Sequence, residues 1–513
     1  MASTLVGLLR STQSWLRTLL LKVLWHLKGE LKGGYRYKQQ QRIAPVPQKY
    51  APIPRVKGLP LVGTLFDLIR AGGAQQLHKY IDARHRQYGP IFRERLGGTQ
   101  DCVFVSSATL MRSVFLHEGQ HPQHPLPEAW TLYNKLHACQ RGLFFMEGAE
   151  WYHNRRILNR LLLNGNLNWM DVHIESITQK LVERWCLQTQ AVIGGSYELP
   201  QLEEQLYRWS IEVVCGIMFG SSSLTCENIQ AALDNFTLTV HKMFEHSSLL
   251  MNFPPKLAQL LRLRIWRDFE QNVDLVLKQS SNIIELFIAK QQPRESRESG
   301  ETDTLYQRLL ASELPIELIR RIFVDLVIAA GDTTAFSSQW ALYALGQQPD
   351  LQHRMAKELE LANPTKSLLL HGLIKEALRL YPVAPFIGRY LPQDVELGGH
   401  FIEKKTLVLL SLYTAGRDPT NFEEPLSILP ERWSPQSELL HQSHGSLPFA
   451  IGQRSCIGRR VALKQLHVLL GVCTTKFQMQ CLNERPVDCV LRMVTVPSET
   501  LRLALKLRQA TGS

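Results

Sequence analysis

The sequence predicts a mainly α-helical protein with a minor β part, and three observations lead to this fold class. Apolar residues recur at helical spacing through most of the chain up to about residue 380. Strand signals are confined to two stretches, residues 89–106 and 383–411. The 513 residues are 44% hydrophobic and 20% charged and contain no internal repeat, so we expect a large core rather than a disordered chain.

The first 42 residues are basic and amphipathic. They contain eight Lys and Arg residues against Glu30 alone, so they account for +7 of the net charge of +12. Lys22 interrupts the longest apolar run, which leaves no stretch of about 20 apolar residues to span a membrane. We predict a mitochondrial transit segment at residues 1–42, with a peripheral membrane-surface helix as the alternative. No nucleic-acid-binding motif accompanies the charge, so we expect no nucleic-acid partner.

The elements that follow the leader are marked by prolines, glycines and polar runs. Residues 43–63 form a proline-rich connector, because their prolines disfavour a helix. Residues 89–106 predict a β-hairpin, with apolar runs on either side of Gly97-Gly98. Residues 291–303 form a polar loop between helices, and prolines make 417–434 irregular. The folded domain is expected at residues 64–508.

Nine cysteines occur, an odd number without a C-x-x-C pair. This pattern argues against a disulfide framework or a zinc module and favours a reducing compartment. One of them, Cys456, lies in FAIGQRSCIGRR (449–460), just before a segment that predicts a helix beginning near Ile457. A single thiolate suffices as the axial ligand of haem iron, and the backbone N–H groups and the helix start would stabilise its charge. The alternative is a buried structural cysteine in front of a helix.

The residues around this cysteine suit a haem ligand. The glycines permit close approach of the backbone, Arg454 is placed to pair with a haem propionate, and Phe449 can pack the loop into the core. The pattern F-x-x-G-x-R-x-C-x-G occurs by chance on the order of once in 10⁴ chains of this size. It resembles the haem-binding signature of the cytochrome P450 superfamily, and its members here are Phe449, Gly452, Arg454, Cys456 and Gly458.

The resemblance extends from about residue 50 to 508 and implies a specific architecture. It implies the cytochrome P450 fold, with haem b (iron protoporphyrin IX) between a distal acid–threonine helix and the cysteine-ligand loop. The cysteine thiolate would push electron density toward the iron and favour O–O cleavage of dioxygen. Residues 64–508 would form a haem-thiolate monooxygenase domain.

A second family motif is a buried charge cluster. In KEALRLYP (375–382), Glu376 and Arg379 are spaced i,i+3 and so share a helix face. PERW (430–433) follows and supplies Arg432. The resemblance implies a Glu–Arg–Arg triad that maintains the register of the fold and performs no chemistry, so loss of one partner should be costly.

Two further segments resemble haem-propionate contacts. WYHNR (151–155) places Trp151 and Arg155 one helical turn apart, for which ordinary packing is the alternative. Arg389 follows the Glu–Arg helix, at a position where many members of the family contact the other propionate.

The distal helix is identified by AAGDTT (329–334), which places Asp332 and Thr333 inside an apolar helix. A threonine can bond back to a carbonyl one turn earlier and open the helix, and a simple kink is the alternative interpretation. In the family this pair guides water and protons to dioxygen, although Ala330 stands where glycine is usual and narrows the distal groove. The candidate substrate-pocket residues, each of which could equally belong to the core, are Ile328, Ala329, Val383, Phe386 and Ile387.

Several features resemble the mitochondrial members of the superfamily. They are the leader, Gln339-Trp340, and the basic residues Lys375, Arg459 and Arg460, which suit docking of an acidic ferredoxin supplied by an NADPH-dependent ferredoxin reductase. His371 and Leu463 depart from that pattern. The implied location is the inner membrane, with the enzyme bound peripherally and facing the matrix. Within 243–267 an apolar group is followed closely by basic residues, which suits an interfacial segment or an ordinary packed connection; the apolar residues are Leu249, Leu250, Met251 and Phe253, and the basic ones are Lys256, Arg262, Arg264 and Arg267.

The narrowest resemblance lies in three runs, at 80–101, 331–342 and 444–460. They are similar to the insect mitochondrial ecdysteroid 2-hydroxylases, which implies conversion of the steroid 2-deoxyecdysone to ecdysone in moulting-hormone biosynthesis. Residue spacing alone does not specify the carbon attacked. Another mitochondrial steroid hydroxylase, a haem-thiolate isomerase or peroxygenase, and a non-enzymatic haem sensor are the alternatives.

Overall fold

The computed structural model describes residues 50–60, 62–97, 101–192, 195–290, 303–361 and 366–509. The predicted leader, the first part of the connector and nearly all of the polar loop at 291–303 lie outside them. The chain divides into two units, one of Met1–Pro52 with Gly399–Phe401, the other of Ile53–Gly398 with Ile402–Ser513. Every candidate site residue belongs to the second unit, which is described here.

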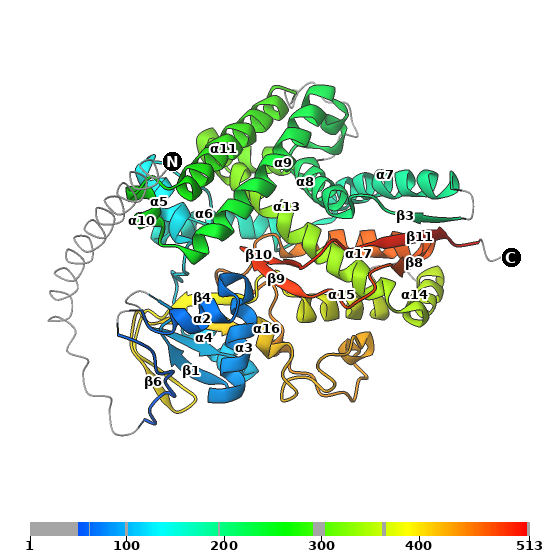
Figure 1. The fold of residues 1–513 in the computed structure, drawn as a ribbon. Coiled ribbons are helices and arrows are strands. Elements are labelled where there is room, and N and C mark those ends of the chain that lie inside the picture. Colours follow the sequence, from blue (N-terminus) through cyan, green and yellow to red (C-terminus); the bar gives the residue numbers. More distant parts are fainter. Residues whose placement is uncertain are drawn as a thin grey trace, which may run out of the picture. The chain divides into compact units, whose positions relative to one another are not determined.

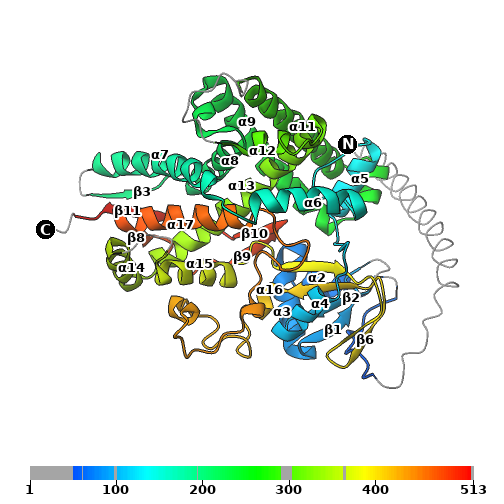
Figure 2. The same ribbon diagram turned by 180° about the vertical axis from the view of Figure 1, so that it is seen from behind.

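The predicted fold class is confirmed: this unit is mainly helical, and the long helix α13 (Ile316–Gly346) runs through it (Figure 1). Helices α8 (Leu202–Phe219), α9 (Glu227–Leu249) and α11 (Arg264–Lys290) lie on one side of α13. Helices α15 (Leu368–Leu380) and α17 (Arg459–Lys476) lie on the other side, as the view from behind also shows (Figure 2). Every residue of α13 from Thr334 onward is buried, so this helix forms the centre of the core.

The unit contains further α-helices, some of which, including α3 and α4, pack beside the strands instead of on α13. They are α2 (Leu65–Arg70), α3 (Leu77–Tyr88), α4 (Ala108–Leu116), α5 (Glu128–Leu136), α6 (Gly148–Leu162), α7 (Asp171–Gln190), α10 (Pro255–Leu260), α12 (Leu305–Leu310), α14 (Pro349–Leu361) and α16 (Leu412–Ala415).

Both predicted β stretches are confirmed, and they meet in one four-stranded sheet. Strands β1 (Ile91–Glu94) and β2 (Cys102–Val105) form the antiparallel hairpin. β2 pairs in parallel with β7 (Leu407–Ser411), which pairs antiparallel with β4 (Phe386–Tyr390). The order is therefore β1-β2-β7-β4, and the second stretch also contains β5 (Val395–Leu397) and β6 (His400–Ile402).

The smaller sheets use strands that we did not predict from the sequence. β11 (Leu503–Leu507) lies between β3 (Ser196–Glu198) and β8 (Phe477–Cys481) in one sheet. β9 (Cys489–Arg492) and β10 (Val494–Pro497) form a hairpin.

Close packing of α8 on α13 depends on one glycine. A Cβ added at Gly331 would lie 2.5 Å from Cζ of Tyr207 on α8, closer than van der Waals contact permits. The ring therefore occupies the space that a side chain at this position would need. Ser210 on α8 also donates a hydrogen bond of 2.8 Å to the Ala330 carbonyl. These contacts fix the part of α13 that contains the candidate distal residues.

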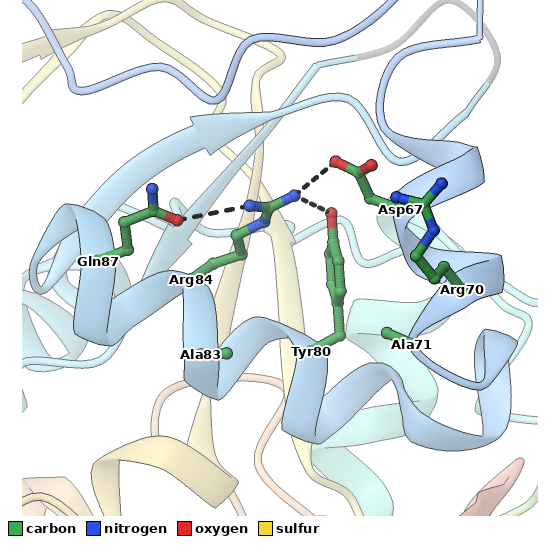
Figure 3. Close-up of a pocket in the computed structure, with 7 residues that line it drawn as sticks. All are labelled: Asp67, Arg70, Ala71, Tyr80, Ala83, Arg84 and Gln87. Atoms are coloured by element: carbon green, nitrogen blue, oxygen red, sulfur yellow. Dashed lines mark hydrogen bonds and ion pairs between the residues drawn. The ribbon is translucent and has the colours of Figure 1, made fainter.

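A polar network joins α2, α3 and β1 beside the pocket drawn in Figure 3. Arg84 donates to the Asp67 carboxylate at 2.9 Å and to the Tyr80 hydroxyl at 2.8 Å. Tyr80 and Thr64 in turn donate to the buried carboxylate of Glu94. Because a buried carboxylate is stable only with such partners, we interpret this network as structural.

Candidate active site

The loop before α17 presents Cys456. Its N–H donates to the Phe449 carbonyl at 2.8 Å, and the Ser455 N–H donates to the Gly452 carbonyl at 3.2 Å, so the loop closes on itself. Gly452 has φ +81°, a left-handed conformation that glycine adopts without strain. Phe449 packs against the main core, as expected from the sequence.

Opposing effects act on the Cys456 sulfur. Cys456 is exposed to the space in front of the loop, but the protein packed around its sulfur limits hydration, and this desolvation raises the pKa of the thiol. Hydrogen bonding from the Gly458 and Arg459 backbones and the positive charges of Arg155 and Arg459 lower it. These groups partly stabilise the thiolate, and a bound metal cation would stabilise it further.

Three arginines and a histidine gather around this loop. Arg155, on α6, donates to the Ser455 carbonyl at 2.5 Å. Arg454 donates to the Met146 carbonyl, lies 3.0 Å from Nδ1 of His124 and stacks over the Trp151 ring with 4.3 Å to its centroid. Nearby positive charges, after burial itself, lower the pKa of His124 to about 3, so this histidine is neutral.

The third arginine, Arg389 on β4, is held by a residue that sequence reasoning missed. Its Nε donates to the Glu118 carboxylate at 2.6 Å, and both side chains are buried. The other oxygen of Glu118 accepts the Gln453 N–H at 2.7 Å. Glu118 therefore joins the β4 arginine to the cysteine loop.

Whether haem fits this cluster can be judged from the nitrogen atoms that lack a hydrogen-bond acceptor. Within the described part of the chain, Nε of Arg155, Nη2 of Arg389, Nε of Arg454 and Nε2 of His124 are buried without a hydrogen-bond acceptor. Burial, and to a smaller extent the charges of Arg389 and Arg155, lower the pKa of Arg454 to about 10, although Glu147 raises it. Two propionates would supply both the acceptors and the negative charge, so the residues fit haem beside a single thiolate.

The predicted Glu–Arg–Arg cluster is assembled without exposure to solvent. Glu376 accepts bonds of 2.8 and 2.7 Å from Arg379, and Nε of Arg432 lies 3.3 Å away. Its two oxygens also accept the Trp433 indole N–H and the Leu429 N–H, each at 2.9 Å. All three charged side chains are fully buried, so the carboxylate is satisfied from every side.

On the distal helix, the predicted threonine back-bond is present. Thr333 Oγ1 donates to the Ala329 carbonyl at 2.8 Å, and α13 remains α-helical throughout. Thr333 and Ala329 are exposed although they lie on the central helix among buried residues, so this face borders an open space. Asp332 is buried, on a different face.

The family assignment follows from the sequence as a whole. A profile of the family described as Cytochrome P450 matches residues 53–505. The chain belongs to the cytochrome P450 family. It is a monooxygenase whose cofactor is haem with a cysteine thiolate as axial ligand.

Several known P450s are similar to this one. Cytochrome P450 315a1, mitochondrial, of Drosophila melanogaster is 70% identical over 473 residues, 90% of each chain. The mitochondrial cholesterol side-chain cleavage enzyme of Oncorhynchus mykiss is 27% identical over 87% of this chain and 88% of its own. The mitochondrial 1,25-dihydroxyvitamin D(3) 24-hydroxylase of Rattus norvegicus is 28% identical over 89% of each. The structure of retinoic acid-bound cyanobacterial CYP120A1 has the same fold, with a TM-score of 0.69, 22% identity and coverage of 90% and 100%.

Asp332 of this P450 faces charged groups on other elements. Burial raises the pKa of Asp332 to about 8, the neighbouring Tyr207 hydroxyl lowers it, and the charge of Glu203 raises it further. Asp332 lines a small pocket with polar and apolar residues of α8, α9 and the β9–β10 hairpin. Glu203 lies 3.7 Å from His241 at this pocket, and Arg492 is exposed there. The pocket thus brings polar side chains next to Asp332, whose raised pKa favours the protonated carboxyl group at neutral pH.

The candidate substrate-pocket residues occupy different surroundings. Ala329 is exposed on α13, whereas Ile328 is buried in the main core. Val383 packs with a small apolar cluster that includes Val496 of β10. Phe386 and Ile387 are half-buried and pack with separate apolar clusters at the sheet. Of the five, Ala329 alone is exposed, on the same face of α13 as Thr333.

The three candidate docking residues also differ in exposure. Arg460 is exposed and Arg459 is partly exposed, and neither has an ion-pair partner among the described residues. Lys375 is half-buried, with its ammonium 4.8 Å from the centroid of the Trp433 ring. Burial lowers the pKa of Lys375. It is a less accessible cation than we expected from the sequence.

Proposed function

We propose that this P450 hydroxylates carbon 2 of an ecdysteroid, converting 2-deoxyecdysone to ecdysone in moulting-hormone biosynthesis. The observation behind this proposal is the resemblance of the runs at 80–101, 331–342 and 444–460 to the insect ecdysteroid 2-hydroxylase known as Shadow. A Drosophila mitochondrial P450 with 70% identity is compatible with it. A second candidate is another mitochondrial steroid hydroxylation, because relatives are named for cholesterol and vitamin D substrates.

In this proposal the cysteine loop and its arginines bind the cofactor. Cys456 would be the thiolate ligand, and Arg155, Arg389 and Arg454 would neutralise the two propionates through nitrogens that have no other acceptor among the described residues. The Trp151 ring stabilises Arg454 by cation–π stacking. When bound, haem supplies the activation of dioxygen that inserts one oxygen atom into a C–H bond.

On the distal side, we assign proton transfer to Asp332 and Thr333. A carboxyl group with a pKa of about 8 holds a proton at neutral pH and can release it when the demand arises. The Thr333 hydroxyl lies at the open face of α13, where it can orient that proton toward dioxygen. Glu203 and His241 at the neighbouring pocket can restore the proton from solvent.

Electrons are proposed to come from a mitochondrial ferredoxin, reduced by an NADPH-dependent reductase and docked near Arg459, Arg460 and Lys375. The double variant Arg460→Glu with Lys375→Gln should raise the ferredoxin concentration that gives half-maximal turnover. The defect should deepen as ionic strength falls, because repulsion is then less screened. Lys242→Glu, on the exposed face of α9, is the matched control and should leave ferredoxin dependence unchanged. If the double variant and the wild-type protein needed the same ferredoxin concentration for half-maximal turnover, the docking surface would lie elsewhere.

We propose a mitochondrial location, with residues 1–42 as the targeting leader, 43–63 as the connector and 64–508 as the monooxygenase domain. Deletion of the leader should abolish import, and a truncated protein that still reaches mitochondria would contradict this division. Relatives of this chain are named mitochondrial.

We also propose peripheral attachment to the matrix face of the inner membrane. Among the residues described, no helix has the length and apolar character needed to cross a membrane. Leu249 and Met251 are exposed near the end of α9, whereas Leu250, an expected contact, is buried. Replacing Leu249 and Met251 by serine should reduce binding to anionic liposomes without changing the haem spectrum. Leu187→Ser on α7 is the control, and equal binding by all variants would exclude this segment.

The decisive experiment is identification of the product. Purified enzyme with ferredoxin, reductase and NADPH would receive 2-deoxyecdysone and a panel of ecdysteroids and other sterols. Ecdysone as the main product is the expected result. Hydroxylation at another carbon, or preference for a sterol that is not an ecdysteroid, would favour the second candidate.

A further inference from the structure

Glu118 is a buried carboxylate that none of the roles described above uses. It lies two residues beyond the end of α4, and only 3% of the residue is exposed. A carboxylate removed from water requires charged or hydrogen-bonding partners. Its partners come from two distant segments, since Arg389 is 271 residues and Gln453 is 335 residues further along the chain.

The bond from Glu118 fixes the orientation of the Arg389 guanidinium. Nε of Arg389 donates to the carboxylate at 2.6 Å, and Nη1 donates to the Gly388 carbonyl at 2.9 Å. Two of the three nitrogens are thereby committed, and Nη2 remains buried without an acceptor in the described part of the chain. The charge of Arg389 acts on both Arg454 and His124, lowering the pKa of each. The free nitrogen thus belongs to the same cluster as the other candidate propionate contacts.

The second bond from Glu118 fixes the cysteine loop. Oε1 accepts the N–H of Gln453 at 2.7 Å, three residues before Cys456. Arg155 binds the Ser455 carbonyl at 2.5 Å. Glu118 and Arg155 therefore anchor two successive parts of the loop that presents the sulfur.

Glu118 also explains why the residue before Gln453 is a glycine. A Cβ added at Gly452 would lie 2.1 Å from Oε1 of Glu118, which is impossible without displacement of the carboxylate. The positive φ of Gly452 is a separate cost for any other residue. The loop sequence and Glu118 are consequently matched to one another.

We propose that Glu118 is a positioning residue that sets the charge around Arg389 and the conformation of the cysteine loop, the two parts of the chain that would hold the haem. This inference rests on the proposed assignment of Cys456 as the iron ligand. The carboxylate offsets the positive charge of Arg389 and holds the loop in the conformation that presents the thiolate. Without that negative charge, the arginine cluster would favour the reduced, less positive state of the iron. A full charge about 10 Å from a redox centre, at an effective dielectric constant of about 20, changes such an equilibrium about tenfold.

The test uses full-length, haem-loaded protein with Glu118→Gln. Glutamine keeps an acceptor for the Gln453 N–H but removes the charge opposite Arg389. We expect the ratio of ferrous to ferric protein at a fixed potential to rise about tenfold, which corresponds to a positive shift of about 59 mV for one electron. Glu403→Gln is the matched control, because Glu403 forms a similar 2.6 Å ion pair with Arg93 on β1. Both variants should lower thermal stability, but only Glu118→Gln should move the potential. An unchanged potential would overturn the electrostatic role.

A double-mutant cycle tests the link to the loop. Gly452→Ala is made in the wild-type protein and in Glu118→Ala, and the rate of haem transfer to apomyoglobin is measured for each. Because alanine at 118 leaves room for the new methyl group, Gly452→Ala should accelerate haem loss by a smaller factor in that background. Equal factors would show that only backbone strain matters at Gly452. A wild-type protein without a thiolate spectrum would instead refute the Cys456 assignment, whatever the variants show.

Discussion

Replacing Asp332 by asparagine should change the way in which stability depends on pH. Burial raises the pKa of Asp332 from its ordinary value of 3.8 to about 8. Between these two values the folded protein retains a proton that the unfolded chain has released. Stability of the wild-type protein therefore falls as pH rises through this window and is constant in this respect outside it. Asparagine does not titrate, so the variant lacks this contribution.

The size of the effect follows from the shift. The slope is about 1.4 kcal/mol per pH unit while the folded group stays protonated and the unfolded group does not. Between pH 5 and pH 7 the wild-type protein should lose roughly 2.7 kcal/mol relative to Asp332→Asn. Urea unfolding of both proteins at equal haem content, at several pH values, measures this difference directly. Parallel curves from pH 5 to pH 7 would refute a buried, protonated Asp332.

A second pair of variants tests the cause of the shift. The charge of Glu203 raises the pKa of Asp332, whereas the neighbouring Tyr207 hydroxyl lowers it. The upper limit of the pH range in which stability falls is the pKa of Asp332 in the folded protein. Glu203→Gln should therefore lower this limit, and Tyr207→Phe should raise it. If the upper pH limit moved in the same direction in both variants, the assignment of these two neighbours would be contradicted.

Three further predictions concern the other candidate residues. Cys456→Ser should abolish the red-shifted band of the reduced, carbon monoxide-bound protein, and retention of that band would disprove the ligand assignment. Thr333→Ala should reduce product formed per NADPH while haem binding is kept; Ser337→Ala is the control, because its hydroxyl makes the same bond to a carbonyl one turn earlier, at 2.7 Å. Glu376→Gln should cost about 3–5 kcal/mol of stability because it leaves buried arginine charge unpaired. Glu431→Gln removes a partly exposed partner of Arg354 nearby and should cost about 1 kcal/mol or less, so equal losses would contradict the importance of burial.

The parts of the molecule that were predicted correctly are encoded locally. The hairpin has short apolar runs on either side of Gly97, the second β stretch is also defined by neighbouring residues, and both contain strands. The Thr333 back-bond is likewise a contact within one helical turn. In these cases the residues that decide the structure are near neighbours in the chain, so pattern and outcome agree.

The contacts that were missed join residues far apart in sequence. Glu118 follows an ordinary helix, and nothing around it indicates a partner 335 residues away. His124 meets Arg454 across 330 residues for the same reason. The exposure of a side chain also depends on residues that are distant in sequence. Lys375 was expected at an open surface, but its ammonium lies over the ring of Trp433. Only the folded chain determines which side chains are covered.

Asp332 and Thr333 lie on different faces of α13, which would separate the access of substrate from the access of protons. Successive residues of an α-helix point about 100° apart, so one helix wall can face two compartments. Thr333 faces the open space beside Ala329, while Asp332 faces Tyr207 and the polar pocket beyond it. In the proposed reaction, bulky apolar molecules would enter by one side and protons by the other. The cavity wall could then be reshaped for a different substrate without rebuilding the supply of protons.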